Sequence, residues 1–286
     1  METIRFIRKT GNSKEVLKVN KKNGVTFLTY PLLSQCGGFR HGFSTRLGGV
    51  SKGIFESMNL SFSRGDQAEA VMENFKRIAD AIGFSHEAMV LSDQTHTTNV
   101  RVVTKKDAGS GIMRPKDFFE TDGLITNEPG IVLTTFYADC VPLFFIDPVH
   151  KAIGLSHSGW RGTVGRMGEK TLQTMKREFG TKPEEVFAAI GPSICADCYE
   201  IGEDVASVFA KEFKENAEQI LFPKGNGKYR LDLWKANEQI LEQAGILPDR
   251  LAVTDICTCC NPKLLFSHRA SNGQRGNLAA FLEICE

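Results

Sequence analysis

The sequence carries almost no excess of charge of either sign. Its 35 lysine and arginine residues are balanced by 34 aspartate and glutamate residues, which leaves a formal net charge of +1. Proteins that bind nucleic acid usually show a basic excess or a basic stripe, so this balance argues against a nucleic-acid partner. The nearest basic cluster, Lys21-Lys22, precedes Asn23-Gly24 and is typical of a solvated hairpin end.

Long hydrophobic runs are absent too. The most apolar stretch, 131–146, contains Asp139 in its middle and is shorter than the roughly 20 residues that a membrane helix needs. The segment 1–11 alternates apolar and basic side chains, without the apolar segment of a secretion signal. We therefore expect a soluble, cytoplasmic protein with no membrane partner.

Regular alternation of strands and helices, internal repeats and low-complexity segments are all lacking. Apolar runs of strand length are mixed with segments of helical period, and the apolar fraction of 41% is ordinary for a globular chain. This mixture predicts an α+β fold with central mixed β-sheets flanked by helices rather than a doubly wound parallel fold. Because no linker is visible, we expect a single domain over 1–286, with a strand and hairpin segment at 1–30.

Local patterns predict the individual elements. A helix is expected after Asp66, with Gly83 where its C-terminal cap belongs. Asn23-Gly24 between apolar residues predicts a hairpin turn. Further helices are expected at 163–179, 204–213 and 233–244, and strands at 100–103, 124–126, 131–137, 143–146, 152–155, 186–190, 252–254 and 279–282.

Eight cysteines are many for a protein without an export signal. Disulfides are not expected in the cytosol, so metal ligation, catalysis and burial remain as explanations. Cys195/Cys198 and Cys257/Cys260 form two Cys-x-x-Cys pairs, but 58 residues separate them. Common zinc sites place such pairs about 15–20 residues apart. A four-cysteine zinc site and ordinary burial are both open interpretations.

Three residues that can bind metal follow apolar, strand-like runs. They are His96, Cys140 and His157. Strand ends present side chains to clefts, and two imidazoles with one thiolate suit Zn²⁺ while leaving a fourth position open for catalysis. The competing interpretation is that each of the three is a satisfied structural residue.

Two glycine-rich segments contain an arginine that could bind an anion. In one, Gly159 and Gly162 flank Arg161 just before a predicted helix, whose N-terminus would favour phosphate. The glycines could equally serve only a tight turn. In the other, 42–51, Arg46 lies between small residues and could bind an anion or a sugar hydroxyl, or could belong to a surface loop.

Six motifs occur in a fixed order along the chain. They are Gln94-Thr95-His96, Thr121-Asp122-Gly123, Ala138-Asp139-Cys140-Val141-Pro142, His157-Ser158-Gly159-Trp160-Arg161-Gly162, Ile190-Gly191-Pro192 and Phe266-Ser267-His268-Arg269. Together with the Arg46 loop and Asn59-Leu60, they make the chain from about Phe39 to Phe281 closely resemble the laccase-domain (YfiH-type) family. Members of that family have been called polyphenol oxidases and purine nucleoside phosphorylases.

The resemblance implies a metal site, an activity and a fold. The family's three metal ligands match His96, Cys140 and His157, with Zn²⁺ as the metal and Cu²⁺ as an alternative. The implied reactions are phosphorolysis of adenosine, inosine and S-methyl-5'-thioadenosine, together with adenosine deamination, so the expected partners are nucleosides and phosphate. The implied fold is a mixed-sheet fold distantly similar to the cytotoxic-necrotizing-factor deamidases.

Roles in this chemistry can be assigned to several residues as hypotheses. Asp139 could stabilise positive charge, supply a proton or orient a neighbouring ligand, and Arg161 could hold phosphate. With Cys140, these two form the expected catalytic set. The residues expected to contact substrate are Arg46, Asn59, Asp122 and Ser44.

The chain departs from the family pattern at two places. Thr97 follows the first histidine, where the family usually has glycine. Near the C-terminus the family usually carries Gly-Arg, whereas this chain has Gly276-Asn277 with Arg275 one residue earlier. We therefore transfer no family role to Arg275.

Two other functions use the same residues. Cys140 could be the nucleophile of a thiol hydrolase or amidase that edits cell-wall precursors, with His157 as its base and Asp139 or Asp122 as orienter. A copper-binding polyphenol oxidase would use the two-histidine, one-cysteine set. A multicopper oxidase needs many more histidines, and this chain has six, with no His-x-His pair.

Overall fold

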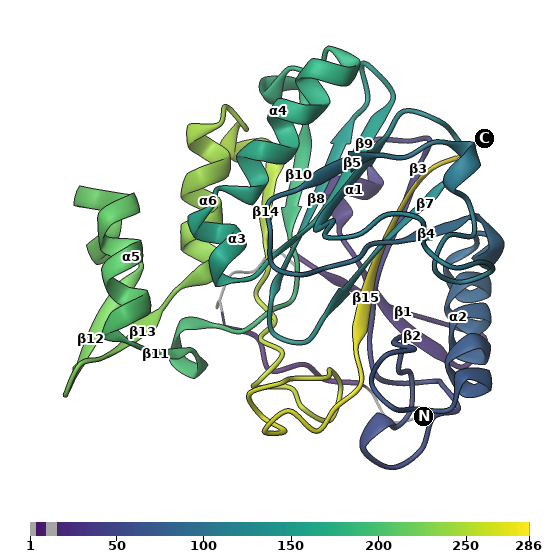
Figure 1. Cartoon of the computed structure of the whole chain (residues 1–286), viewed down its shortest axis with the longest axis horizontal. Helices are drawn as coiled ribbons and strands as arrows, with labels where there is room; N and C mark the ends of the chain where they lie inside the picture. Colours follow the sequence, from purple (N-terminus) through teal and green to yellow (C-terminus); the bar gives the residue numbers. More distant parts are fainter. Residues whose placement is uncertain (1–3, 10–15, 286) are drawn as a thin grey trace.

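Two six-stranded sheets lie face to face at the centre of the protein in a computed structural model that describes residues 4–9 and 16–285 (Figure 1). The first sheet has the order β1 (Lys18–Lys22), β2 (Val25–Thr29), β3 (Phe39–Ser44), β15 (Leu278–Ile284), β7 (Val132–Tyr137) and β4 (Met89–Leu91). All neighbours are antiparallel except β4 and β7.

The second sheet is parallel at both edges and antiparallel in its middle. Its order is β14 (Leu251–Val253), β10 (Phe187–Ile190), β8 (Val141–Asp147), β9 (Ala152–Ser158), β6 (Gly123–Thr126) and β5 (Val100–Val102). Only β10 with β14 and β5 with β6 run parallel. The predicted mixed sheets are therefore confirmed.

A small third sheet projects from the side of this body (Figure 1). It contains β11 (Glu200–Gly202), β13 (Lys228–Leu231) and β12 (Leu221–Gly225), all antiparallel, and α5 (Glu203–Phe213) packs on it. No strand of this sheet was predicted from the sequence pattern, because its strands are short and each buries only one residue.

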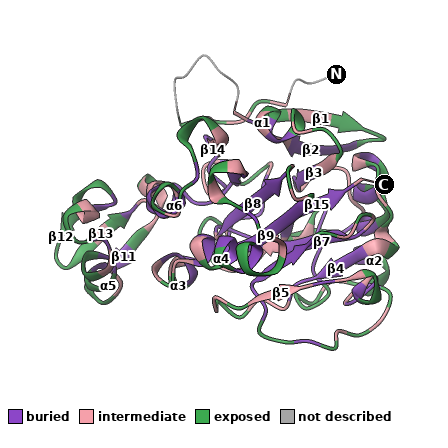
Figure 2. Ribbon diagram, turned by 90° about the horizontal axis from the view of Figure 1, so that it is seen from above, coloured by how far each residue is buried: buried purple, intermediate pink, exposed green. Residues whose placement is uncertain are grey.

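Most of the remaining helices cover the outer faces of the two large sheets, whereas α1 (Pro31–Ser34) contacts β3 and β10 and packs on the core between the sheets. Figure 2 shows the buried strands enclosed by helices whose outer sides are exposed. The other helices are α2 (Ala68–Ile82), α3 (Trp160–Val164), α4 (Met167–Phe179) and α6 (Leu233–Gln243), and 3-10 turns occupy Gly53–Phe55, His86–Ala88, Lys105–Asp107, Pro183–Glu185, Ala196–Cys198, Lys214–Gln219 and Pro248–Arg250. Among the described residues, no helix is both long and apolar enough to cross a membrane.

The sequence of β8 is apolar at almost every position, and the packing of this strand explains why. Leu143 and Phe145 pack in the cluster under α4 and α6, whereas Phe144 and Ile146 pack in the cluster between the two sheets. Successive side chains of a strand point to opposite faces, and here both faces are buried. The two sheets and their covering helices thus form four layers.

Two local predictions are confirmed and one is wrong. The hairpin turns at Asn23-Gly24, and α2 ends at Gly83 in a left-handed conformation with φ of 104°. The single helix expected at 163–179 is instead divided into α3 and α4 at Arg166, whose φ is 59°. Part of the expected segment 1–30 lies outside the described residues.

His41 is held neutral inside the first sheet. It is only 5% exposed, and its Nε2 accepts a hydrogen bond from the Tyr30 N–H at 2.8 Å. Burial lowers the pKa of His41 to about 4, because the charged imidazolium would lose its hydration and could no longer accept this bond.

Acidification should therefore weaken the fold through His41. Its folded pKa lies below its unfolded value, so its contribution is complete above about pH 6.5 and falls as the pH drops towards 4. The expected loss is roughly 3 kcal/mol over that window. Urea unfolding of wild type and His41→Gln at pH 7, 5.5 and 4.5 should show a flatter pH dependence in the variant. Equal slopes would contradict this.

Candidate functional site

Three side chains separated in sequence meet at one end of the second sheet. The ligand atoms of His96, Cys140 and His157 all lie within 4.8 Å of one another. The Cys140 sulfur is 4.0 Å from His96 Nε2, and the two imidazole rings are 5.0 Å apart and nearly perpendicular. The structure thus brings together the ligand set that the family resemblance implies.

Antiparallel register explains this meeting. Cys140 directly precedes β8, Asp122 directly precedes β6, and His157 lies near the end of β9. Pro142 of β8 pairs with His157, while Gly123 of β6 pairs with the adjacent residue of β9. The first residues of β6 and β8 and the last residues of β9, the strand between them, therefore lie at the same end of the sheet. His96 joins them from the loop after β4.

Asp122 anchors this arrangement from beneath. Its fully buried carboxylate accepts a hydrogen bond from His157 Nδ1 at 2.8 Å and from the N–H groups of Thr95, His96 and Thr97. Burial raises the pKa of Asp122, but the hydrogen bonds from His157 and Thr97 outweigh it and hold the pKa below its ordinary value. Asp122 accordingly positions both histidines, with Nε2 of His157 left free to bind a metal.

Thr97 takes part in the same network. Its N–H and its hydroxyl donate to Asp122 Oδ2 at 2.8 and 2.9 Å. Thr97, which stands where the family usually has glycine, thus adds a hydroxyl donor to the buried Asp122 carboxylate. The loop turns at His96, whose φ of 66° lies in the left-handed region. Such conformations in residues other than glycine often occur at functional sites.

Gly159 lets the ligands approach one another. A Cβ atom at this position would lie 3.1 Å from the Cys140 sulfur and 3.0 Å from Cδ2 of His96. Its φ of −71° is open to any residue, so the requirement for glycine comes from space rather than from backbone conformation.

Electrostatics favour an ionised sulfur at this position. Burial raises the pKa of Cys140, but the adjacent His157 and His96 outweigh it and lower the pKa to about 6. Burial lowers the pKa of His157, whereas Cys140 and Asp122 raise it to about 9. A thiolate is both the metal-binding form of cysteine and its nucleophilic form.

The three side chains lie where two lobes of one cleft meet. A cavity of about 390 Å³, here named the cationic lobe, is lined by Arg64, Lys116 and Arg275 among others. A cavity of about 280 Å³, here named the aromatic lobe, is lined by Trp160 and Tyr199 and also by Arg161, Arg269 and Arg275. Both lobes share His96, Ala138, Cys140 and Arg275.

Arg275 is a candidate site residue to which sequence analysis gave no role. It lines both lobes, and its buried Nε has no hydrogen-bond partner among the described residues. Burial and the charge of Arg64 lower the pKa of Arg275 to about 10. An unused donor on a cation that faces a second cation indicates an anion site. The signal in the sequence was an arginine one residue before the expected Gly-Arg.

Asp139 and Arg161 line the aromatic lobe. The Asp139 carboxylate accepts hydrogen bonds from the Thr258 hydroxyl at 2.6 Å and from the Arg269 N–H at 2.7 Å. The Arg161 guanidinium lies over the Trp160 ring, 4.3 Å from its centre. The helix that follows Gly159 has only five residues, so its dipole offers little to an anion.

The other predicted substrate residues lie outside both lobes. Asn59 is buried, and its Oδ1 accepts hydrogen bonds from the N–H groups of Ser61 and Asn277, which do line the cationic lobe. Ser44 is buried and accepts from the Ala279 N–H. Arg46 borders a separate hollow, donates to two backbone carbonyls and lies over Phe266.

Replacing Gly159 should impair metal binding without unfolding the protein. In Gly159→Ala the new methyl group would displace His96 and Cys140, and zinc affinity should fall roughly 10-fold or more, as is typical when ligand support is lost. Competition with a chromophoric chelator measures this. The matched control is Gly162→Ala, whose methyl group meets its nearest neighbour at 3.4 Å and should bind zinc normally. Wild-type affinity in Gly159→Ala would contradict this role.

Known proteins are similar to this chain in sequence and in fold. A family model described as "Multi-copper polyphenol oxidoreductase laccase" matches residues 40–285. The chain is 38% identical to a purine nucleoside phosphorylase of Deinococcus radiodurans, covering 85% of this chain and 88% of that protein. It is 35% identical to purine nucleoside phosphorylase YlmD of Bacillus subtilis, covering 86% of this chain and 88% of that protein.

A solved structure agrees with these matches. The crystal structure of the hypothetical protein YfiH from Bacillus licheniformis has a TM-score of 0.88 at 31% identity, covering 93% of this chain and 98% of that chain. Sequence, fold and the His-Cys-His cluster lead to one conclusion. The chain belongs to the laccase-domain family.

Proposed function

We propose that this protein is a zinc-dependent purine nucleoside phosphorylase that acts on adenosine, inosine and S-methyl-5'-thioadenosine. One observation carries the proposal: a His-Cys-His cluster lies between a cationic lobe and an aromatic lobe of a single cleft. Phosphorolysis needs an anion site and a purine site on either side of the ribose. Relatives at 35 and 38% identity bear the name purine nucleoside phosphorylase.

The cationic lobe suits phosphate. Lys116 already donates to Asp93 and to the Ser92 carbonyl, so its charge is largely matched. Arg275 has an unused donor and Arg64 adds a second charge. Two guanidinium groups can neutralise a phosphate dianion and hold it in a defined orientation.

The aromatic lobe suits a purine. Trp160 and Tyr199 each have one ring face covered by a guanidinium, of Arg161 and of Arg269, and would offer the remaining aromatic surface to the base. Ile194 and Leu233 add apolar contact. Aromatic rings stack on bases, and this arrangement tolerates adenine and hypoxanthine alike. Different substituents at the 5' position of the ribose would then have to be accommodated where the lobes meet.

The donor set fits zinc. His96, Cys140 and His157 would hold the ion, and three protein ligands leave one coordination position open. Copper would also accept this set. When bound, zinc supplies a Lewis acid and lowers the pKa of a coordinated water.

The chain's own residues account for the remaining steps. Arg275 and Arg64 hold phosphate, whose oxygen forms the new bond to C1' as the bond from C1' to the purine breaks. The electron pair of the broken bond leaves with the purine, which takes up the proton that hydrogen phosphate gives up. Asp139, fixed by Thr258 and Arg269, faces the lobe that would hold the base and stabilises positive charge on the ribose.

Adenosine deamination is proposed at the same cleft. Water would add at C6 of the base and ammonia would leave, which gives inosine. A carboxylate is needed to move the protons, and Asp139 is the carboxylate that lines the aromatic lobe.

A thiol hydrolase is the second candidate, and one observation favours it. Cys140, His157 and Asp122 are ordered like a nucleophile, its base and an orienting carboxylate, with the Cys140 pKa lowered to about 6.

A copper-binding polyphenol oxidase has less support. Within the described residues, no group of potential metal ligands contains more than two histidines, which is too few for a trinuclear copper cluster.

Phosphate and metal dependence separate these functions. Zinc-loaded protein should release adenine from adenosine only when phosphate is present, with equimolar ribose 1-phosphate, as measured by chromatography. Chelation should abolish the reaction and zinc should restore it. Hydrolysis that survives chelation without phosphate would favour the thiol mechanism and contradict the proposal.

Arg275 should determine the affinity for phosphate. Arg275→Gln should raise the KM for phosphate roughly 10- to 100-fold, because a charge-assisted hydrogen bond contributes about 1.5–3 kcal/mol, while the KM for adenosine changes little. Steady-state kinetics with each substrate varied measures this. Arg46→Gln is the control and should keep both constants. A phosphate effect confined to Arg46→Gln would overturn the assignment.

A further inference from the structure

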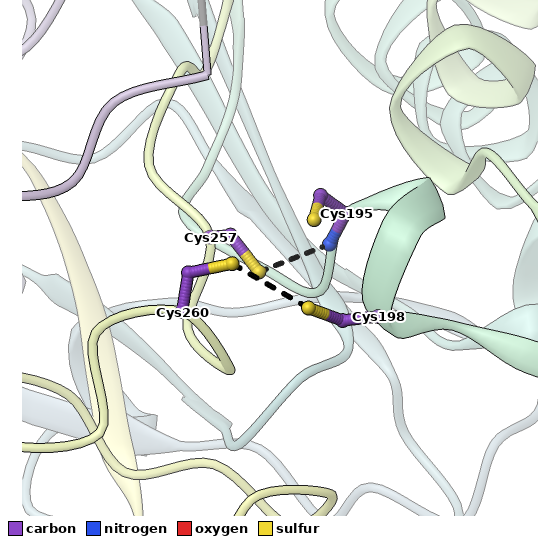
Figure 3. Close-up of side chains that lie close together, drawn as sticks. All are labelled: Cys195, Cys198, Cys257 and Cys260. Carbon is purple, nitrogen blue, oxygen red and sulfur yellow. Dashed lines mark hydrogen bonds between the residues drawn. The ribbon is translucent and has the colours of Figure 1, made fainter.

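A second cluster of metal-binding side chains lies apart from the cleft. Cys195 and Cys198 come from the turn between β10 and β11, and Cys257 and Cys260 come from the segment between β14 and β15. Figure 3 shows the four side chains directed toward one another, and their sulfur atoms all lie within 4.8 Å of each other. They unite the two Cys-x-x-Cys pairs that are far apart in sequence.

The spacing of the sulfurs suits a tetrahedral ion. A zinc–sulfur distance of about 2.3 Å places the sulfurs of a tetrahedral site roughly 3.8 Å apart. The Cys198 and Cys260 sulfurs are 3.4 Å apart, and the other separations stay within 4.8 Å. Small side-chain rotations would therefore complete the site without moving the backbone.

The backbone holds the two pairs in register. Ser193 forms a parallel bridge with Cys257, and the Thr258 N–H donates to the Ser193 carbonyl at 3.1 Å. The Cys195 N–H points at the Cys257 sulfur at 3.3 Å (Figure 3). Amide donors of this kind support thiolate ligands. The site is therefore preorganised by groups that do not depend on the ion.

In the other group of potential ligands outside the cleft, Asp147, His150 and Glu185, the Asp147 carboxylate already has hydrogen-bond partners, whereas Glu185 Oε2 has none among the described residues. Both oxygens of Asp147 accept hydrogen bonds, from the N–H groups of Val149 and His150 and from the His150 ring. This carboxylate therefore caps a turn. The four cysteine sulfurs instead lie against one another and against a backbone N–H. Four soft sulfur ligands select zinc or iron.

We propose that Cys195, Cys198, Cys257 and Cys260 bind a structural zinc ion, independent of the function proposed for the cleft. The ion would fasten together two segments that both reach the aromatic lobe. Tyr199 directly follows Cys198 and lines that lobe. Thr258, which directly follows Cys257, donates to the catalytic candidate Asp139.

Arg269 extends the connection. Its guanidinium donates to the carbonyls of Cys198 and Glu200, both at 3.1 Å, and its N–H donates to Asp139. Both hydrogen-bond donors to the Asp139 carboxylate are thus tied to the four-cysteine site. Binding of zinc there would order the wall of the aromatic lobe.

Metal content and X-ray absorption test this proposal. Protein purified without chelator should contain two zinc ions per chain, one for each cluster. In a His96→Ala/Cys140→Ser variant, which lacks the cleft ligands, one zinc should remain with four sulfur neighbours. Zinc lost entirely from that variant, or bound there by nitrogen or oxygen, would overturn the proposal. This measurement leaves the four cysteines unchanged.

Variants of the four cysteines give the converse result. Cys198→Ser and Cys260→Ser should each reduce zinc from two ions to one, and the remaining ion should have one sulfur neighbour. The matched control is Cys259→Ser, adjacent to the site but outside the group of four, which should retain both ions. Two ions in Cys260→Ser would contradict the assignment.

Thiol titration excludes the alternative of a disulfide. Unfolded, metal-free wild-type protein prepared without reductant should titrate all eight thiols. A result of six, with Cys198 and Cys260 joined in a peptide map, would replace the zinc site by a disulfide. Either result is independent of whether the cleft releases adenine from adenosine.

Discussion

The buried carboxylate of Asp122 is the constraint on which the functional site depends. A buried charge without partners is costly, so the chain must surround it with donors. The donors are the backbone of the loop at 95–97, the hydroxyl of Thr97 and the ring of His157. Satisfying one carboxylate therefore fixes the loop that carries His96, the tautomer of His157 and the distance of both from Cys140.

The sheets place this constraint at the junction of two chemically different cavities. Because β9 runs antiparallel to both β6 and β8, the starts of β6 and β8 and the end of β9 lie at one end of the second sheet. Asp122, Cys140 and His157 lie there. The C-terminal segment adds Arg275, which lines both lobes, and the segment after β14 adds the partners of Asp139 in the aromatic lobe. In the proposed reaction phosphate attacks C1' of the ribose and the purine leaves, so the two lobes would hold the attacking group and the leaving group.

Features determined by nearby residues were predictable from sequence. The Asn23-Gly24 hairpin and the helix that ends at Gly83 depend on local backbone preferences. The mixed sheets followed from apolar runs without regular alternation. The division between α3 and α4 was not predictable, because Arg166 reaches Glu212 and Gln243, which are distant in sequence. The same is true of the four cysteines, whose 58-residue separation is closed by the parallel pairing of β10 with β14.

The metal ligands were identified by the resemblance of the chain to a family. The residues that would bind substrate were harder to predict from the sequence. Arg46 looked like an anion site because glycine surrounds it, yet it borders a separate hollow and donates through Nε and Nη1 to two backbone carbonyls. Arg275 departs from the family spacing by one residue and still reaches the cleft. Position relative to the cleft distinguishes the two arginines, and only coordinates reveal it.

Anomalous diffraction from crystals grown with zinc and soaked with phosphate tests the central claim most directly. Maps from data collected on either side of the zinc absorption edge should show a peak bonded to His96, Cys140 and His157, with phosphate density beside Arg275. Zinc bound elsewhere while these three side chains remain unliganded, or phosphate located only near Arg46, would contradict the account.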